Sequence, residues 1–448
     1  MLYNITDKFI DEIYSLSEKD LTQKEINSAK SFLIDYIGVT LAGAYLIKDK
    51  LEKIISFFDS FGQSTALGLN NKQSVQSSIY LNGISSHIAE LDDGVIQSSV
   101  HPGAPLFSVL IPVAEKEKVS SVQFLKGIVL GYEAIIRLAN TVQPSHKKKG
   151  YHATATCGSI GSALGLAVML NMSKKEMKNA FSSAIISAAG TLKSIENDSQ
   201  LKPVNVANAA LNAYLAVATS FSGFSGPDDP LSGKRGFLNV MSNEYNVEEL
   251  FSDNKTCFSI EKVYVKPYAA CRYCHPSIDA AFAIMDKIKN INEIKEVEIE
   301  TYELAVFNHD HTIIKNISSA KMSIPFSFSL ALIIGSAGIE DFSENNINSQ
   351  SIIDLTKKIK VTSNKEFTKN FPKKSECLVK VLTVDGHVIN KKINFPLGEP
   401  ENPINQESLK IKFNSLGKFS GLSQLETKNI LDKIFNIEEK LNELFPLL

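Results

Sequence analysis

The chain has 448 residues, more than the roughly 250 to 300 residues that one hydrophobic core supports, so we expect two domains. A hydrophobic fraction of 44% and a charged fraction of 21% are ordinary for a water-soluble globular protein. The net charge of -2 gives no electrostatic reason to expect binding to nucleic acid or to an anionic membrane surface.

Targeting and redox signals are weak. The N-terminus lacks a basic start, an apolar core and a cleavage site, and no apolar run reaches the roughly 18 residues that a membrane span needs. The chain has five cysteines, an odd number that fits reduced thiols better than a disulfide framework. We therefore expect a cytoplasmic protein with no membrane partner.

The first 262 residues predict helix after helix. Thr22 with Glu25, and Ser173 with Glu176, are capping boxes ahead of apolar residues at helical spacing, so helices should begin near residues 23 and 174. Small and apolar residues cover all faces of 180–190, which predicts an interior helix. Segments 153–170 and 205–218 are rich in Ala, Gly and Ser, which predicts a compact bundle of closely packed helices.

The pattern changes after about Lys262. Residues 297–302 alternate between apolar and polar, as in a half-buried strand, and 378–384 and 387–393 flank the hairpin signal Asp385-Gly386. Helical patterns cover 324–334 and 351–359, and the last 45 residues return to helix. We predict a mainly α protein with an α+β insert: a helical domain over 1–262, an α/β lid over 263–403, and C-terminal helices over 404–448 that complete the helical domain.

Glu90 to Gly103 is the stretch richest in acid and base groups. It holds Glu90, Asp92, Asp93 and His101, and Pro102 restricts His101 to an extended backbone. Loops of this kind often carry chemistry. A solvated acidic helix end followed by a turn is the alternative, because surface carboxylates are the norm.

Further candidate residues follow. His152 leads into a small-residue helix whose N-terminus favours an anion, and Lys202 before Pro203 opens another helix at a point suited to a carboxylate. Lys266 and Arg272 lie where the helical domain gives way to the insert, so we expect both cations to face the interdomain cleft. Cys271 to His275 also matches the c-type haem motif, but the missing export signal and the absence of a second cysteine pair disfavour haem and zinc. His309-Asp310-His311 with Lys321 stays unassigned.

The order and spacing of these motifs resemble the MmgE/PrpD family, which contains 2-methylcitrate dehydratase, cis-aconitate decarboxylase and iminodisuccinate epimerase. The resemblance extends over nearly the whole chain. The residues that carry it are His87, Glu90 to Gly94, His101 to Gly103, Gly131 to Glu133 with Arg137, Gly150 to His152, Gly158, Lys202-Pro203, Asn208, Gly223 to Pro227, Lys266 to Tyr268, Cys271-Arg272, His275 and Ala320-Lys321.

The resemblance implies a large helical domain, a smaller α/β lid, a pocket between them and a homodimer. It also implies catalysis on a small di- or tricarboxylate without a metal or an organic cofactor. Carried over residue by residue, it implies a site made of Asp92, Asp93, His101, His152, Lys202 and Lys266, with Arg272 and Glu90 added as substrate-binding residues.

The chemistry of these residue types agrees with that site. Removing a proton next to a carboxylate builds negative charge, which well-placed cations stabilise, and a histidine can take and return the proton. We predict that His101 transfers the proton, that His152 assists, and that Asp92 or Asp93 orients or accepts. Lys202, Lys266 and Arg272 would hold the substrate.

Departures from the family pattern bear on the reaction. Glu90 and Gly94 stand where the decarboxylase and the dehydratase generally show Asp and Thr, and Val306 lies near the place of a decarboxylase tyrosine. These departures argue against cis-aconitate decarboxylation. The leading hypothesis is a lyase that dehydrates a hydroxylated polycarboxylate such as 2-methylcitrate. Epimerisation, isomerisation or decarboxylation of a related acid is the alternative, and a catalytically inactive binding protein is a third.

Overall fold

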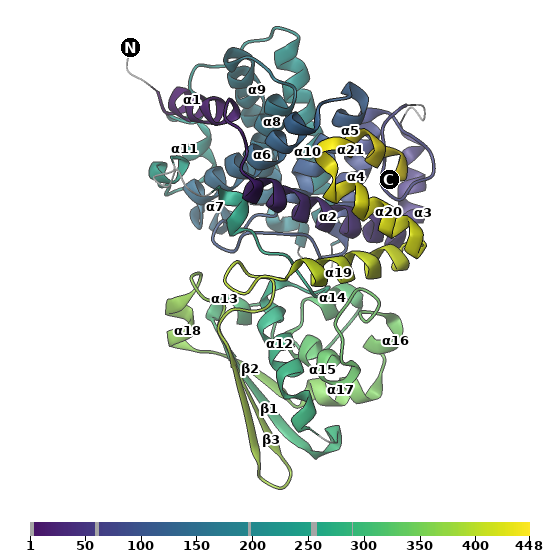
Figure 1. Ribbon diagram of the computed structural model, residues 1–448. Helices are drawn as coiled ribbons and strands as arrows, with labels where there is room; N and C mark the ends of the chain where they lie inside the picture. Colours follow the sequence, from purple (N-terminus) through teal and green to yellow (C-terminus); the bar gives the residue numbers. More distant parts are fainter. Residues whose placement is uncertain (1–3, 59–61, 196–198, 252–257, 289) are drawn as a thin grey trace. The chain divides into compact units, whose positions relative to one another are not determined.

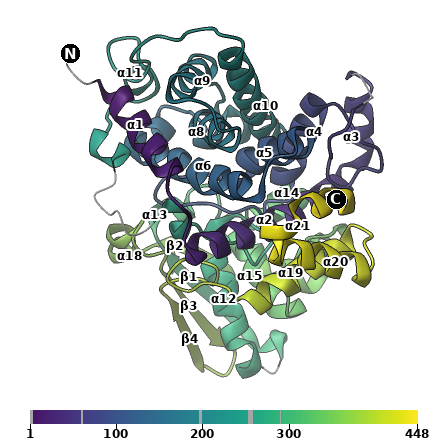
Figure 2. The ribbon, with the colours of Figure 1, turned by 45° about the horizontal axis from the view of Figure 1, so that its top comes forward.

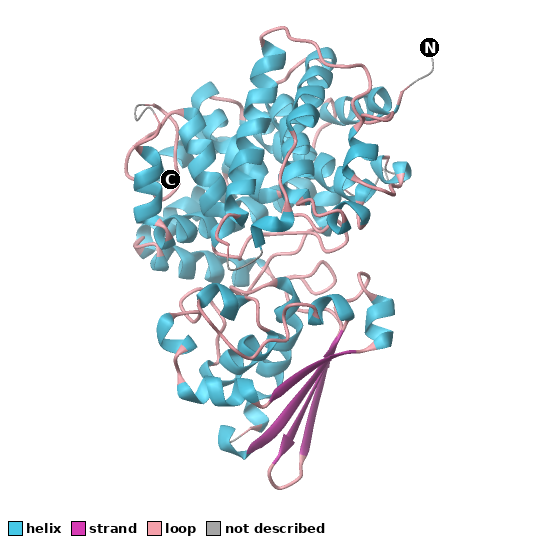
Figure 3. Cartoon of the chain, turned by 180° about the vertical axis from the view of Figure 1, so that it is seen from behind, coloured by secondary structure: helices cyan, strands magenta, loops and turns pink. Residues whose placement is uncertain are grey.

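The chain folds into two compact units in a computed structural model that describes residues 4–58, 62–195, 199–251, 258–288 and 290–448. The first unit comprises Met1–Val263 and Asn405–Leu448, and the second comprises Tyr264–Ile404. The described strands all lie in one small sheet, and the rest of the regular structure is helical (Figure 3). This confirms the predicted mainly α class with an α+β part.

The first unit is a bundle of helices (Figure 1). Its α-helices are α1 (Ile5–Ser17), α2 (Gln23–Leu46), α3 (Lys48–Ile55), α4 (Val75–Ile88), α5 (Gly103–Glu117), α6 (Ser121–Val142), α7 (Ser145–Lys148), α8 (Ala153–Met169), α9 (Lys174–Ser187), α10 (Lys202–Phe221), α11 (Phe237–Met241), α19 (Gln406–Phe419), α20 (Gln424–Phe435) and α21 (Ile437–Leu444).

Local capping signals fix where several helices begin. Both predicted capping boxes form, at Thr22 ahead of α2 and at Ser173 ahead of α9. The prediction of an interior helix over 180–190 is wrong in part. Helix α9 ends at Ser187, and Ile186 is 69% exposed, because α9 buries only the faces that pack on α1, α8 and α10.

Helix α8 forms the core of the first unit. All of its residues are buried, and α5, α6, α9 and α10 pack around it (Figure 2). Small residues make this possible: a Cβ added to Gly161 would lie 2.5 Å from the backbone nitrogen of Ile135 in α6. The predicted close packing of small-residue helices is therefore confirmed, and it fixes the N-terminus of α8, where His152 lies.

The C-terminal helices belong to the first unit. Helix α19 packs along α2, and the Lys412 ammonium lies 2.5 Å from a carboxylate oxygen of Asp35 on α2. Lys412 also donates to the Leu91 carbonyl oxygen at 3.2 Å. The end of the chain thus braces the loop that follows α4, although the two segments are far apart in sequence.

The second unit combines one sheet with short helices. Its elements are α12 (His275–Ile284), β1 (Ile294–Thr301), α13 (Glu303–Val306), α14 (Ile317–Lys321), α15 (Ile324–Ile334), α16 (Glu344–Ile347), α17 (Gln350–Lys357), β2 (Ile359–Ser363), α18 (Lys365–Asn370), β3 (Cys377–Thr383) and β4 (Val388–Ile393).

The described strands have the order β2-β1-β3-β4, with β1 parallel to β2 and the other pairs antiparallel. Helix α12 packs on β3 and β4, and α15 packs on α12 and α17. The predicted hairpin at Asp385-Gly386 forms between β3 and β4. The prediction of helix to Ile359 is wrong at its end, since α17 stops at Lys357 and Ile359 begins β2 in register with Val297.

In the part of the chain described by the structure, no individual helix combines the length and apolar character of a membrane span; α2 and α3 satisfy those criteria only together, with a bend of 85° between them.

Replacing Gly161 by alanine should destabilise the first unit. The new Cβ would meet Ile135 Cγ1 at 2.4 Å, and overpacking of this kind lowers the free energy of unfolding by about 1 to 3 kcal/mol. Urea unfolding measures the change. Gly38→Ala in α2 is the control, because its Cβ would meet only side-chain atoms, with Phe413 Cδ2 at 3.1 Å and Leu416 Cδ1 at 3.3 Å as the nearest. Equal effects of the two substitutions would contradict the packing described for α8.

Candidate active site

The loop between α4 and α5 carries the predicted acid and base groups into the interior of the first unit. Glu90 adopts a left-handed backbone conformation with φ of 58°, which turns the chain sharply after α4. Asp92 and Asp93 that follow are 5% and 4% exposed. The alternative of a solvated acidic turn is therefore wrong for these two carboxyl groups, and both need hydrogen-bond partners inside the protein.

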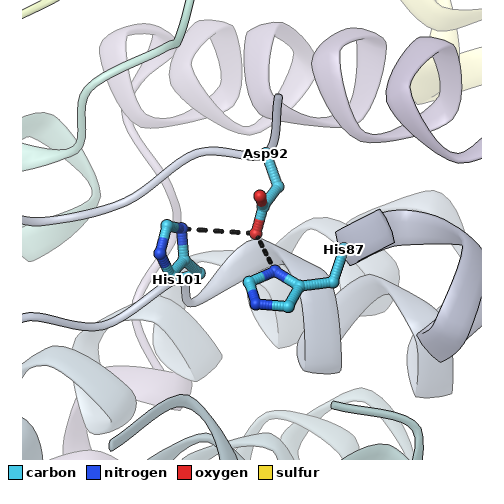
Figure 4. Close-up of side chains that lie close together, drawn as sticks. All are labelled: His87, Asp92 and His101. Carbon is cyan, nitrogen blue, oxygen red and sulfur yellow. Dashed lines mark hydrogen bonds and ion pairs between the residues drawn. The ribbon is translucent and has the colours of Figure 1, made fainter. Parts of the chain in front are cut away.

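Asp92 lies between two imidazoles (Figure 4). Its Oδ2 atom is 2.6 Å from His87 Nδ1 and 3.3 Å from His101 Nδ1. His87 comes from the last turn of α4, and His101 immediately precedes Pro102 at the start of α5. One carboxylate thus orients two histidines that reach it from opposite ends of the loop.

The hydrogen bonds of His101 define its protonation. Nδ1 lies 2.5 Å from the carbonyl oxygen of Asp93, and since a carbonyl only accepts, Nδ1 carries the proton. In the neutral ring, Nε2 then holds the lone pair that can accept a proton. The backbone N–H of His101 donates to Thr154 Oγ1 at 3.1 Å, which ties the residue to the first turn of α8. The side chain is 17% exposed, so the ring is accessible in part.

His152 precedes α8 and presents the opposite tautomer. The Asn205 amide nitrogen lies 3.2 Å from the Thr191 carbonyl oxygen, 3.1 Å from Ser194 Oγ and 3.4 Å from His152 Nδ1, so its two hydrogens are shared among three acceptors. An amide nitrogen donates and does not accept. Nδ1 therefore accepts, and the neutral ring carries its proton on Nε2. Burial lowers the pKa of His152 well below its ordinary value, and His87 and the Lys202 ammonium lower this pKa further. His152 is thus a neutral N–H donor near pH 7.

The Asp93 carboxyl group is held by hydrogen bonds inside the protein. Its carboxyl group accepts from the Gly103 N–H at 3.1 Å, at the start of α5, and from the Tyr132 hydroxyl at 2.5 Å. The cavity beside it, lined in part by Asp35 and Asp92, has a volume of about 10 Å³ and holds at most one water. Burial raises the pKa of Asp93 to about 8, against the lowering effect of Tyr132.

Glu90 and Lys202 form an ion pair. Lys202 is the first residue of α10, and its Nζ lies 2.6 Å from Glu90 Oε1. The two side chains are 19% and 20% exposed, so the pair is within reach of solvent. The Lys202 ammonium, which we predicted from the sequence to bind a substrate carboxylate, is therefore paired with Glu90 in this structure.

Lys266 and Arg272 belong to the second unit. Lys266 is 1% exposed. The Arg272 guanidinium donates through Nη2 to the Glu399 carboxylate and lies over the Tyr264 ring, with Cζ 5.2 Å from the ring centroid. Their role in holding a substrate stays a prediction.

Among the residues of the first unit whose side chains or backbone contact the predicted set, His87, Thr154, Tyr132 and Asn205 were not chosen as site residues from the sequence. His87 and Tyr132 lie in family-like motifs, which was the available signal. Asn205 lies in the segment that Lys202-Pro203 opens and Thr154 follows His152, but neither contact could be predicted, because each partner, His152 for Asn205 and His101 for Thr154, lies 53 residues away in sequence.

The ligand atoms of His87, Asp92 and His101 lie within 4.8 Å of one another, which would suit a metal ion. The hydrogen bonds argue otherwise. His101 Nδ1, which faces Asp92, carries a proton directed at the Asp93 carbonyl and would have to lose it before it could bind a metal. The arrangement therefore suits proton transfer better than metal binding.

Comparison with known proteins decides the family. Residues 8–250 match the MmgE/PrpD N-terminal domain, and residues 268–436 match the MmgE/PrpD C-terminal domain. The chain belongs to the MmgE/PrpD family. The predicted resemblance is thus confirmed over most of the chain.

Curated relatives match this MmgE/PrpD protein over nearly its full length. A protein of Mus musculus named cis-aconitate decarboxylase is 23% identical, over 99% of this chain and 92% of its own. Proteins of the same name from Aspergillus terreus and Homo sapiens are each 22% identical, over 99% of this chain and 95% and 93% of their own.

Replacing Asp93 by asparagine should change how stability depends on pH. Because the folded-state pKa is raised from 3.8 to about 8, the folded protein keeps a proton that the unfolded chain releases in this range. Asp93 thus stabilises fully below about pH 4 and loses this contribution as pH rises to about 8, by up to about 1.4 kcal/mol per pH unit. Asp93→Asn, which imitates the protonated group, should lack this loss.

Urea unfolding at several pH values between about 5 and 8 measures the difference. The exposed Asp20→Asn substitution is the control and should follow the unmodified protein. Parallel pH profiles for Asp93→Asn and the unmodified protein would contradict the raised pKa.

Proposed function

We propose that this MmgE/PrpD protein is a cofactor-independent lyase that removes a proton next to a carboxylate of a small hydroxylated di- or tricarboxylate and expels water. The observation that carries the proposal is the state of His101: Nδ1 donates to the Asp93 carbonyl and lies near Asp92, so that Nε2 can act as the base. Asp92 would stabilise the imidazolium that forms.

The proposed step balances as follows. His101 Nε2 takes the proton from the carbon next to the carboxylate, and the C–H electron pair becomes the C=C bond. The adjacent C–O bond breaks, and the hydroxyl leaves as water after receiving from His101 Nε2 the proton taken from the carbon, which returns His101 to its neutral form. Neutral His152 offers an Nε2–H group that can donate a hydrogen bond to a carboxylate oxygen on which charge develops.

Lys202 and Glu90 suit the binding of a polyanion. A substrate carboxylate that approaches Lys202 meets a positive charge already paired at 2.6 Å, so binding would require the carboxylate to share or replace the contact with Glu90. We propose that Lys202 holds a substrate carboxylate in this way, while the substrate-binding roles of Lys266 and Arg272 stay predictions from the resemblance.

Decarboxylation is the second candidate. Its support is that the relatives named cis-aconitate decarboxylase match this chain over nearly its full length. In that reaction a C–C bond breaks to release CO₂, and a protonated His101 would return its proton to the carbon that loses CO₂. Glu90 and Gly94 stand in place of the Asp and Thr typical of the decarboxylase, which favours a different substrate. Epimerisation would use only the first proton transfer.

Incubation of the purified protein with 2-methylcitrate, citrate and cis-aconitate, in ordinary and deuterated water, separates these reactions. Dehydration should give a new alkene signal by NMR without CO₂. Release of CO₂ would favour decarboxylation, and deuterium uptake without a new alkene would favour epimerisation. If no acid reacts, exchanges deuterium or raises the melting temperature, the proposal of a polycarboxylate enzyme is wrong.

The His101→Gln variant should bind substrate but react slowly. Loss of a general base lowers kcat by about 10²- to 10⁴-fold, while KM should change little because His101 is not proposed to hold a carboxylate. His387→Gln, at a histidine whose side chain is 82% exposed in the second unit, is the control for loss of a histidine. A variant that keeps its full kcat would exclude His101 as the base.

A further inference from the structure

A second pair of reactive side chains, one of them next to Arg272 in the sequence, lies in the second unit. Cys271 precedes the short helix η4 (Arg272–Cys274) and is partly exposed. Its Sγ atom lies 3.4 Å from Nε2 of His309. A thiol beside an imidazole is the pairing that activates cysteine nucleophiles, provided that the facing nitrogen can accept a proton.

The tautomer of His309 meets this condition. Its Nδ1 lies 2.6 Å from the Phe307 carbonyl oxygen, which can only accept, so Nδ1 carries the proton and Nε2 presents its lone pair to the Cys271 thiol. The ring is held in place, because the residue is 7% exposed and the Tyr273 ring packs edge-on at 5.1 Å between centroids.

The backbone on both sides is also fixed. The Ile324 N–H donates to the His309 carbonyl at 2.8 Å, and the Cys271 N–H donates to the Lys321 carbonyl at 2.8 Å. The loop that carries His309 and the turn that carries Cys271 are thus both tied to the segment that runs from α14 into α15. The Sγ to Nε2 contact therefore does not depend on a single freely rotating side chain.

The other described cysteines differ from Cys271. Cys157, Cys274 and Cys377 are buried. Burial raises the pKa of Cys157 to about 12 and raises the pKa of Cys274 and Cys377 above the ordinary value as well. Buried thiols of this kind are unreactive, so they serve as internal references.

A metal site is the competing interpretation of a cysteine next to a histidine. A structural metal site needs three or four ligands. Among the residues that the structure describes, the group of three clustered ligand atoms is that of His87, Asp92 and His101, and Cys271 with His309 offers two. The pair therefore fits a nucleophile and its base.

We propose that Cys271 is a covalent modification site, at which His309 takes the thiol proton and the sulfur attacks an electrophilic carbon of a small molecule. With iodoacetamide as the probe, an S–C bond forms, the C–I bond breaks, and iodide leaves. The thiol proton passes to His309 Nε2 and from there to solvent. Cys271 adjoins Arg272, so an adduct would form next to a predicted substrate-binding residue.

Alkylation by iodoacetamide, followed by mass spectrometry of tryptic peptides, tests the proposal. Cleavage after Arg272 separates Cys271 from Cys274, so each thiol is measured by itself. At about pH 6 an ordinary thiol is almost wholly protonated, whereas Cys271 should react about tenfold faster than cysteine in a small peptide. Buried Cys274 should remain unmodified. A Cys271 rate that follows the profile of an ordinary thiol would overturn the proposal without any variant.

The His309→Gln variant should remove this advantage and return the pH profile to that of an ordinary thiol. His311→Gln is the matched control, because His311 lies two residues away and its Nε2 contacts Ser319 instead of a cysteine. The control should react as the unmodified protein does. Equal rates for the two variants, at unchanged melting temperatures, would show that His309 does not activate Cys271.

Discussion

A buried carboxylate shared by two imidazoles is the constraint on which the candidate site depends. Asp92 is 5% exposed, and its Oδ2 atom faces Nδ1 of both His87 and His101. Removing a charge from water is unfavourable unless hydrogen bonds replace those of the solvent. The hydrogen bond with Asp92 therefore places a proton on Nδ1 of His87, and the Asp93 carbonyl places the proton of His101 on Nδ1, which leaves Nε2 of His101 as the basic atom.

Much of the first unit supports this arrangement. Gly103 lets the chain enter α5 against Tyr132 and Asp93, since a Cβ there would lie 2.5 Å from the Tyr132 hydroxyl. Lys412 of α19 holds the Leu91 carbonyl just before Asp92. The small residues of α8 bring its first turn, with Thr154, against His101. The packing of these helices therefore also determines the geometry of the site.

The structural features that could be predicted from the sequence are those that depend on residues close together along the chain. Capping boxes, strand alternation and the Asp-Gly hairpin depend on neighbouring residues, and these predictions were confirmed. The prediction failed at Ile359, where pairing with β1 overrides the helical pattern, and at Ile186, which lies on a face of α9 that no neighbouring helix covers. Tertiary contacts determine secondary structure and burial at such positions, so the periodicity of the sequence alone does not predict them.

The same distinction applies to the site residues. Their residue types and motifs could be recognised in the sequence, but the residues with which they interact could not. Glu90 and Lys202 are 112 residues apart, and Arg272 and Glu399 are 127 apart, so nothing local indicates that either cation is paired. His87 was missed as a site residue because the left-handed turn at Glu90 places it against Asp92, and a periodic helical pattern does not anticipate such a turn.

The protonation state of His101 is the most direct test of the proposal that its Nε2 atom is the base. Long-range ¹H–¹⁵N NMR of protein labelled at histidine distinguishes the two neutral tautomers, and Asp92→Asn and His101→Gln variants assign the relevant signals. The proposed site predicts that neutral His87 and His101 carry their protons on Nδ1 and that neutral His152 carries its proton on Nε2. A neutral His101 with its proton on Nε2 would contradict it, because that ring could neither donate to the Asp93 carbonyl nor offer Nε2 as a base.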